Sequence, residues 1–184
     1  MNNNKTKHII LDIDGTLIRQ IENHDNYQIT GRPHLKEFID YCFATFGTVS
    51  IWTAATKEWY NEVYEKVLRH VIPTDCNFHF VYTRKHITQQ KSQSSYFSDF
   101  STPVVIKPLS KVWKKFEETH TKHNTIILDD TPTTFMWNTK NAIHIKTYSE
   151  SAEDQDNDLK LVMDLLERIK NDESVLESNK SLYI

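Results

Sequence analysis

Cysteine is scarce in this 184-residue sequence: Cys42 and Cys76 are the only two, and they form no CxxC pair. Two cysteines are too few for a disulfide framework, so we expect a protein of a reducing compartment. Long apolar runs are also missing. No stretch approaches the ~20 apolar residues of a membrane helix, and the polar residues 1–5 do not resemble a signal peptide. These absences predict an intracellular protein, cytoplasmic or nuclear, without a membrane partner.

Positive charge is not in excess either. The 22 Lys and Arg residues are outnumbered by 25 Asp and Glu residues, and the formal net charge is −3. This balance gives no basic footprint for nucleic acid, so we expect no direct nucleic-acid partner. What is present fits one globular domain with a real core. We predict a disordered tail at residues 1–6, a single domain at 7–176 and a polar tail at 177–184; the oligomeric state stays open.

Strand and helix patterns alternate along the chain. Short apolar runs predict strands, and apolar residues at helical spacing predict amphipathic helices. The predicted strands are residues 9–11, 48–52, 104–106, 125–128 and 142–145, and the main predicted helices are residues 33–46, 56–70, 110–116 and 159–169. The alternation predicts an α/β fold, a Rossmann-like three-layer sandwich with a mainly parallel central sheet and no large cap.

Several local predictions depend on single residues or short segments. Thr56 and Ser110 are expected to cap helices, and Gly47 is expected to end the first helix in the left-handed conformation. Residues 19–30 are predicted to form a polar loop. Residues 78–104 are predicted to be a small inserted β-element of short strands or a flap, although their polar centre, 89–95, also fits plain disorder.

Polar side chains follow four of the predicted strands. They are Asp12 and Asp14, Thr53, Lys107, and the pair Asp129 and Asp130. Asp12 and Asp14 stand at positions i and i+2, which point to one side of an extended chain. Two unpaired carboxylates this close repel each other, whereas a divalent cation stabilises them because hard cations prefer carboxylate oxygens. Ligand sites of such folds lie beyond the carboxyl ends of the strands, so we expect one site there.

Each of these residues also has an ordinary structural interpretation. An Asp-Gly turn after a strand is common, and a threonine such as Thr53 at a strand end often begins a helix. A lone lysine such as Lys107 is usually at the surface. Asp129-Asp130 before Pro132 suits a capped turn. The ordered set, rather than any one residue, favours a catalytic site.

The ordered set resembles the four motifs of the haloacid-dehalogenase superfamily of phosphotransferases. More narrowly, the chain resembles the NLI-interacting-factor-like branch, which contains the small CTD phosphatases. The segments that carry this resemblance are DIDGT at 12–16, GRPHLKEFI at 31–39, IWTAATKEW at 51–59, KPLSK at 107–111 and LDDTP at 128–132. The resemblance runs from about residue 8 to residue 176.

The resemblance implies a phosphatase that acts through an aspartyl-phosphate intermediate. Asp12 would be the nucleophile, which splits one hard step into two. Asp14 would donate a proton to the leaving oxygen and then activate water. Thr53 would hydrogen-bond a phosphoryl oxygen, and Lys107 would offset the charge of the transferred group.

The resemblance also implies Mg²⁺ as the cofactor. A carboxylate that attacks a phosphate dianion faces strong charge repulsion, which a cation reduces. The implied metal-binding residues are Asp12, Asp14 through its backbone carbonyl, Asp129 and Asp130. The implied substrate-binding residues are Thr16, which would orient the loop, Ala54, and Arg84, which could grip a second phosphate or carboxylate. A surface arginine is the commoner interpretation of Arg84.

Three functions remain open at this point. The first is a phosphatase for phosphoserine or phosphothreonine in a protein such as the RNA polymerase II tail, because only residues 17–52 separate the first two motifs and leave an open site. The second is a phosphatase of a small metabolite or nucleic-acid end, and the third is a non-catalytic binding module. The branch usually has Glu or a similar residue where this chain has Gly15 and His where it has Arg19, so the resemblance implies the superfamily chemistry but does not fix the substrate.

Other chemistry-bearing residues have structural interpretations. His120 and His123 stand three apart without a third ligand nearby, so we predict a solvated helix end rather than a zinc site. The aromatic residues Phe38, Phe43, Trp52 and Trp59 fall on predicted core stripes and need no ligand.

Overall fold

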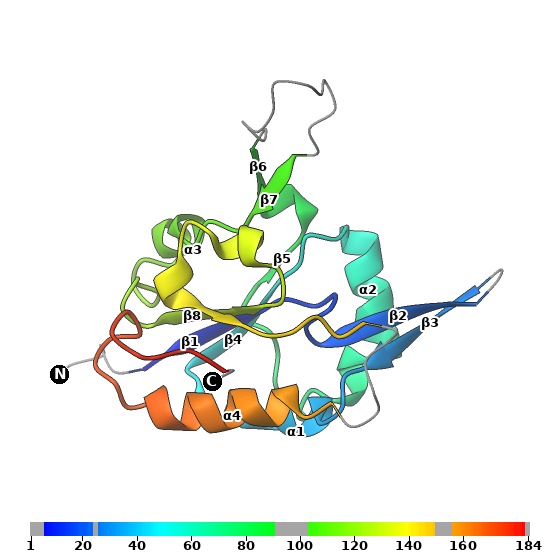
Figure 1. Ribbon diagram of the computed structural model, residues 1–184, viewed down its shortest axis with the longest axis horizontal. Helices are drawn as coiled ribbons and strands as arrows, with labels where there is room; N and C mark the ends of the chain where they lie inside the picture. Colours follow the sequence, from blue (N-terminus) through cyan, green and yellow to red (C-terminus); the bar gives the residue numbers. More distant parts are fainter. Residues whose placement is uncertain (1–5, 24–25, 91–102, 150–155, 183–184) are drawn as a thin grey trace.

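The computed structural model describes residues 6–23, 26–90, 103–149 and 156–182. Its centre is a five-stranded sheet in the order β5-β4-β1-β8-β9, in which every pair of neighbours is parallel (Figure 1). These strands are β1 (His8–Leu11), β4 (Thr48–Trp52), β5 (Val81–Tyr82), β8 (Thr125–Asp129) and β9 (Ala142–His144). The predicted mainly parallel sheet is confirmed, and four of its strands agree with the predicted ranges to within one residue at each end.

Two apolar layers cover the two faces of this sheet. Successive residues of a strand point to opposite faces, so Ile9 and Leu11 join one core cluster whereas Ile10 joins the other. The first cluster packs against α1 (Leu35–Thr45) and α4 (Asp158–Ile169), and α2 (Lys57–Lys66) adds to it. The second cluster packs against α3 (Ser110–Lys115) and the 3₁₀ turn η4 (Pro132–Phe135) (Figure 1). The predicted three-layer α/β sandwich is confirmed.

Further short 3₁₀ turns connect these elements. They are η2 (Leu68–His70), η3 (Arg84–His86) and η5 (Thr139–Asn141). None of the helices in the described part of the chain combines the length and the apolarity that crossing a bilayer takes.

Two antiparallel hairpins project from the sandwich (Figure 1). The first joins β2 (Ile18–Asn23) to β3 (Asn26–Gly31), so the predicted loop at residues 19–30 is wrong. Its strands bury little apolar surface, as the exposed and half-buried residues of β3 show, and this leaves a weak pattern in the sequence. The second pairs β6 (Thr88–Gln90), which lies in the predicted insert 78–104, with β7 (Val104–Ile106), which begins at the last residue of that insert.

The second hairpin corrects the place of one predicted strand. Residues 104–106 do form a strand, but β7 pairs with β6 and not with the central sheet. Lys107 therefore does not follow a strand of that sheet. Most of the polar segment 89–95 lies outside the described residues, as do residues 1–5 of the predicted N-terminal tail.

The helix ends agree only in part with the predictions. Thr56 caps α2 as predicted, because its side chain accepts a hydrogen bond from the backbone N–H of Trp59. Ser110 is the first residue of α3 rather than its cap. Gly47 does not have a positive φ; a glycine is needed there because a Cβ would collide with Thr6 and lie 3.2 Å from Cε1 of His8.

Three histidines gather where the strands of the central sheet begin. Nδ1 of His8 and Nε2 of His120 lie 3.0 and 3.2 Å from Oγ1 of Thr48, and the two rings are 4.3 Å apart. The ring of His79 stacks on that of His120 at 5.4 Å. His120 is only 1% exposed, so its prediction as part of a solvated helix end is wrong, whereas His123 is exposed.

Burial in this cluster opposes protonation. It lowers the pKa of His8, and it lowers the pKa of His120 to about 3, with the neighbouring His8 and His79 adding to the shift. Unfolding would restore an ordinary histidine pKa of about 6.5. The unfolded chain therefore binds more protons than the folded chain between these values.

The first prediction concerns acid stability. Because the unfolded state gains protons at these histidines, their contribution to the free energy of unfolding should fall as the pH is lowered from about 6.5 towards 3. His120→Gln should reduce this loss, so that its urea midpoint falls less than that of the wild type between pH 7 and pH 5. His123→Gln, at an exposed histidine, is the matched control and should follow the wild type. A parallel decline of the His120→Gln and wild-type midpoints would contradict the prediction.

Candidate active site

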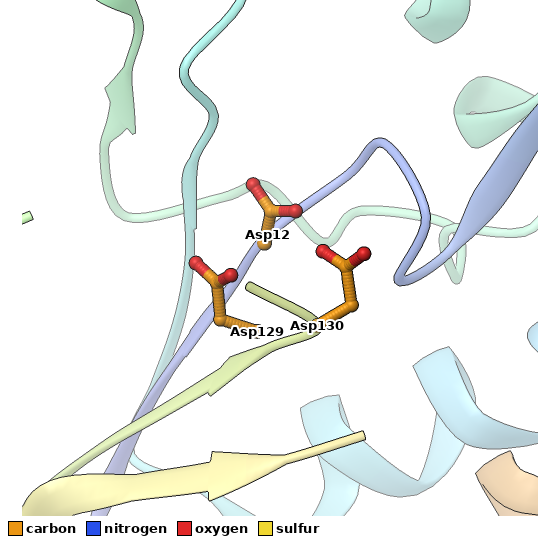
Figure 2. A group of neighbouring side chains, drawn as sticks. All are labelled: Asp12, Asp129 and Asp130. Carbon is orange, nitrogen blue, oxygen red and sulfur yellow. The ribbon is translucent and has the colours of Figure 1, made fainter. Parts of the chain in front are cut away.

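Three carboxylates meet at the carboxyl edge of the central sheet. Asp12 follows β1, Asp129 ends β8 and Asp130 follows it, and Figure 2 shows the three side chains turned towards one another. One oxygen of each lies within 4.8 Å of the others. All three residues are buried, with Asp129 fully inaccessible. Because β1 and β8 are neighbours in the sheet, Asp12 lies beside Asp129 and Asp130, although more than a hundred positions separate them in the sequence.

Lys107 supplies positive charge to this group. Its Nζ lies 2.5 Å from Oδ1 of Asp12 and 2.7 Å from Oδ2 of Asp129, and the side chain is 1% exposed. The lysine enters from the end of β7, outside the sheet. Its backbone N–H donates to the carbonyl of Thr134 in η4 at 2.6 Å, which fixes where the side chain begins. The predicted meeting of Lys107 with the aspartates is present, although its route differs from the one expected.

Burial and like charge make the ionised forms of these carboxylates costly. Burial raises the pKa of Asp12 to about 8, an effect that Lys107 opposes and Asp129 reinforces. Burial also raises the pKa of Asp130, which a hydrogen bond from Thr147 partly opposes. Burial acts to lower the pKa of Lys107, but attraction to Asp12 and Asp129 outweighs it and the net shift is upward. The group thus contains three carboxylates and one ammonium group, that of Lys107, which contacts Asp12 and Asp129.

This surplus of carboxylate fits a hard divalent cation. Such cations take carboxylate oxygens as ligands, and Mg²⁺ is usually held by one or two carboxylates together with water and phosphate oxygens. Asp12, Asp129 and Asp130 offer a suitable set, and a cation among them would lower the cost of keeping all three ionised. The carboxylate of Asp14 does not belong to this group.

The carboxylate of Asp14 is held by two donors on the other side of the loop. Nε1 of Trp59 donates to Oδ1 of Asp14 at 2.6 Å, and Oγ1 of Thr53 donates to Oδ2 at 3.2 Å. Thr53 in turn accepts from the backbone N–H of Ala55 at 3.0 Å. Sequence reasoning placed Trp59 only in the core. It does pack against the core, but its position in the first turn of the helix after Thr53 was the signal for a second role.

The remaining predicted site residues lie around the same edge. Oγ1 of Thr16 is 3.3 Å from Oδ2 of Asp12, so this buried hydroxyl contacts the predicted nucleophile. Arg84 is exposed, and its Nε donates to the carbonyl of Ala54 at 3.1 Å. The backbone N–H of Arg84 also donates to the carbonyl of Ala55 at 2.8 Å. Two of the predicted substrate-binding residues, Ala54 and Arg84, therefore contact each other.

The loop after Asp14 turns sharply at Gly15, where both the backbone conformation and the space available favour glycine. Gly15 has a φ of 78°, a region that side chains rarely adopt. A Cβ at Gly15 would lie 2.5 Å from Oδ2 of Asp130 and 3.0 Å from Cγ2 of Thr147. The loop is tied down on its far side, where the backbone N–H of Tyr148 donates to the carbonyl of Gly15 at 2.7 Å.

Curated proteins with sequence similarity cover most of this chain. Residues 7–176 match the family model described as NLI interacting factor-like phosphatase. The human Ubiquitin-like domain-containing CTD phosphatase 1 is 29% identical over 178 residues, which is 91% of this chain and 51% of that protein. The chain spans about half the length of this and the other vertebrate relatives. A CTD phosphatase-like protein, 355R of Invertebrate iridescent virus 3, is 29% identical over 196 residues, 92% of this chain and 100% of its own length.

Solved structures share the fold at low identity. The structure of Fcp1, an essential RNA polymerase II CTD phosphatase, has a TM-score of 0.52 at 16% identity and covers 91% of this chain and 51% of its own. A protein from Legionella pneumophila described as a HAD superfamily (subfamily III A) hydrolase has a TM-score of 0.52 at 14% identity, covering 95% and 88%. With a family model matching nearly its whole length, the chain belongs to the NLI interacting factor-like phosphatase family.

Proposed function

We propose that this protein is a Mg²⁺-dependent phosphatase that acts through an aspartyl-phosphate on Asp12. The observation that carries the proposal is the buried group in which Asp12, Asp129 and Asp130 lie within 4.8 Å of one another and Lys107 contacts two of them. Such a group suits a reaction in which a carboxylate attacks a phosphate dianion. The ammonium group of Lys107 and a bound Mg²⁺ would both reduce the repulsion between the two negative charges.

Asp12 and Asp14 have separate tasks in the proposed reaction. An oxygen of Asp12 attacks the phosphorus, the bond from phosphorus to the leaving oxygen breaks, and Asp14 gives that oxygen its proton. In the second half, Asp14 takes a proton from water, the water oxygen attacks the phosphorus, and the bond to Asp12 breaks. Lys107 and Thr16, which contact Asp12, hold its carboxylate in place during both halves.

Asp12, Asp129 and Asp130 are the side chains that would hold Mg²⁺. The bound cation supplies charge neutralisation for the phosphoryl group and the attacking carboxylate. Asp129 is already fixed in orientation, because its Oδ1 accepts the backbone N–H of Thr131 at 2.9 Å. Its other oxygen receives Lys107. These two contacts fix the orientation of the Asp129 carboxylate, which would be one of the ligands of the cation.

The proposed substrate is phosphoserine or phosphothreonine in an extended protein segment, such as the RNA polymerase II C-terminal tail. Two observations support it. The curated relatives are named CTD phosphatases, and the described part of residues 17–52, between the first two motifs, forms the β2–β3 hairpin, α1 and β4 without a large domain (Figure 1). A site without a large cap leaves space for a bulky substrate on either side of the phosphate.

The second prediction tests the nucleophile. Asp12→Asn removes the attacking oxygen's charge, so the hydrolysis of 4-nitrophenyl phosphate in the presence of Mg²⁺ should fall by at least about 1,000-fold. Asp40→Asn is the matched control, since Asp40 pairs with Lys36 on the surface of α1 and should leave the rate unchanged. Equal rates for Asp12→Asn and the wild type would refute the proposed chemistry. No turnover by the wild type on any phosphomonoester would favour a binding module instead.

The third prediction tests the metal site by binding rather than by activity. Asp130→Asn should weaken Mg²⁺ binding by about 10-fold or more, because it removes one of three carboxylates from the proposed ligand set. Isothermal titration of the purified protein with MgCl₂ measures this directly. Asp75→Asn removes the same charge from an exposed turn and should not change the affinity. Unchanged Mg²⁺ affinity in Asp130→Asn would contradict the assignment of Asp130.

The fourth prediction concerns the substrate class. On a panel at equal concentration, phosphoserine and phosphothreonine peptides should give higher kcat/KM values than sugar phosphates, nucleotides and phosphorylated nucleic-acid ends. Peptides that carry the heptad sequence of the polymerase tail belong in the panel beside unrelated phosphopeptides. A clear preference for sugar phosphates or nucleotides would reject the protein substrate while leaving the aspartyl-phosphate mechanism intact.

A further inference from the structure

Trp59 makes a contact with the acid/base candidate that its place in the core does not explain. Its Nε1–H donates to Oδ1 of Asp14 at 2.6 Å, which is the shorter of the two bonds that this carboxylate receives from side chains. A tryptophan packed only for its apolar surface has no need to direct its single polar atom there. Each oxygen of the Asp14 carboxylate thus accepts one donor, Trp59 at Oδ1 and Thr53 at Oδ2.

Two elements hold the indole of Trp59 in this position. Its backbone N–H is fixed by Thr56, the cap of α2, at 3.2 Å. Its ring lies 5.6 Å from the ring of Tyr27 in β3, and the hydroxyl of Tyr27 donates to Glu62 of α2 at 2.6 Å. Figure 1 shows α2 and the β2–β3 hairpin side by side at this end of the molecule. The indole of Trp59 is therefore held by its own helix, α2, and by contact with Tyr27 of the β2–β3 hairpin.

The two donors differ in what they allow the carboxylate to do. An indole N–H can only donate, whereas a threonine hydroxyl both donates and accepts. A proton on Asp14 is therefore disfavoured at Oδ1, where Trp59 already donates, and favoured at Oδ2. The hydroxyl of Thr53 can turn to suit either state of Oδ2. The indole N–H therefore makes Oδ1 of Asp14 a hydrogen-bond acceptor and leaves Oδ2 as the oxygen that carries the proton.

We propose that Trp59 is a positioning residue for proton transfer, whose indole N–H fixes the Asp14 carboxylate and directs the transferable proton to Oδ2. The inference rests on the proposed function, in which Asp14 carries that proton. In the first half of the reaction the proton passes from Oδ2 to the leaving oxygen as the phosphorus–oxygen bond breaks. In the second half Oδ2 takes a proton from the attacking water.

The fifth prediction compares two leaving groups. Trp59→Phe removes the donor and keeps an aromatic ring against Tyr27. The alkoxide of a phosphoserine peptide needs a proton to leave, whereas 4-nitrophenolate leaves without one. In single-turnover experiments with Mg²⁺, Trp59→Phe should slow release of the peptide alcohol by about 10–100-fold, a part of the roughly 100–10,000-fold that general acid catalysis contributes, because Asp14 itself stays in place. Release of 4-nitrophenolate should change by less than about threefold, since it does not depend on that proton.

Two further variants separate positioning from packing. Trp113→Phe is the matched control, because Nε1 of Trp113 donates to Oγ1 of Thr125 at 3.2 Å and not to the site; it should match the wild type on both substrates. Trp59→His keeps a ring N–H and should recover part of the phosphoserine rate. Equal slowing of both substrates by Trp59→Phe, or slowing of neither, would overturn the inference.

Asp14→Asn distinguishes a failure of the inference from a failure of the proposed function. If Asp14→Asn loses release from the phosphoserine peptide while Trp59→Phe keeps it, the inference about Trp59 is wrong and the proposed function stands. If Asp14→Asn reacts as fast as the wild type, the proposed role of Asp14 is wrong and the inference falls with it. Selective loss in both variants supports the two together.

Discussion

One buried ammonium group among carboxylates is the interaction on which the site depends. Lys107 reaches Asp12 and Asp129 from outside the central sheet, and it is held at its backbone by the carbonyl of Thr134. Removing one partner of a buried ion pair typically costs about 3–5 kcal/mol, whereas replacing a whole pair by apolar side chains is often neutral or stabilising. Stability therefore gives little reason to keep such a group.

A third carboxylate, that of Asp130, adds repulsion, since it contributes to the raised pKa of Asp12, which is due first to burial. The arrangement instead supports the proposed chemistry, in which a second cation would bind at this edge of the sheet.

The loop that carries the first two aspartates is fixed by an arginine at its far end. The guanidinium of Arg32 is completely buried and donates to the carbonyl of Thr16 at 3.2 Å. The same group forms ion pairs with Asp156 and Asp158 at 2.8 and 3.0 Å, just before and at the start of α4. Five donors in one rigid plane allow an arginine to make all these bonds at once, which a lysine cannot do. The arginine of the GRPHLKEFI segment thus connects the loop after β1 to the start of α4. Its part in the motif is structural support of the site.

The sequence predicted the site best where a candidate site residue directly follows or ends a clear strand pattern. Asp12 and Asp129 end apolar runs that can hardly be anything but buried strands, so their meeting at one sheet edge followed from the parallel order. The contacts that were missed depend on parts of the chain distant in sequence. The β2–β3 hairpin has little buried apolar surface to produce a periodic pattern. A helical stripe predicts that Trp59 is buried but not where its one polar atom points. Likewise His120 looked exposed because its neighbours are polar, and its burial comes from packing against His8 and His79.

Gly15, where the chain departs from its branch, follows from the position of Asp130. The backbone there has a positive φ, and a Cβ would lie 2.5 Å from a carboxylate oxygen of Asp130. A larger residue would have to push Asp130 away from the turn or change the path of the loop between Asp14 and Thr16. Asp130 is one of the three carboxylates proposed to hold the cation. The absence of a side chain at Gly15 therefore leaves the space that the Asp130 carboxylate occupies. The departure at Gly15 therefore concerns how the proposed metal site is packed. It leaves the proposed nucleophile in place, and it does not by itself argue for a different substrate.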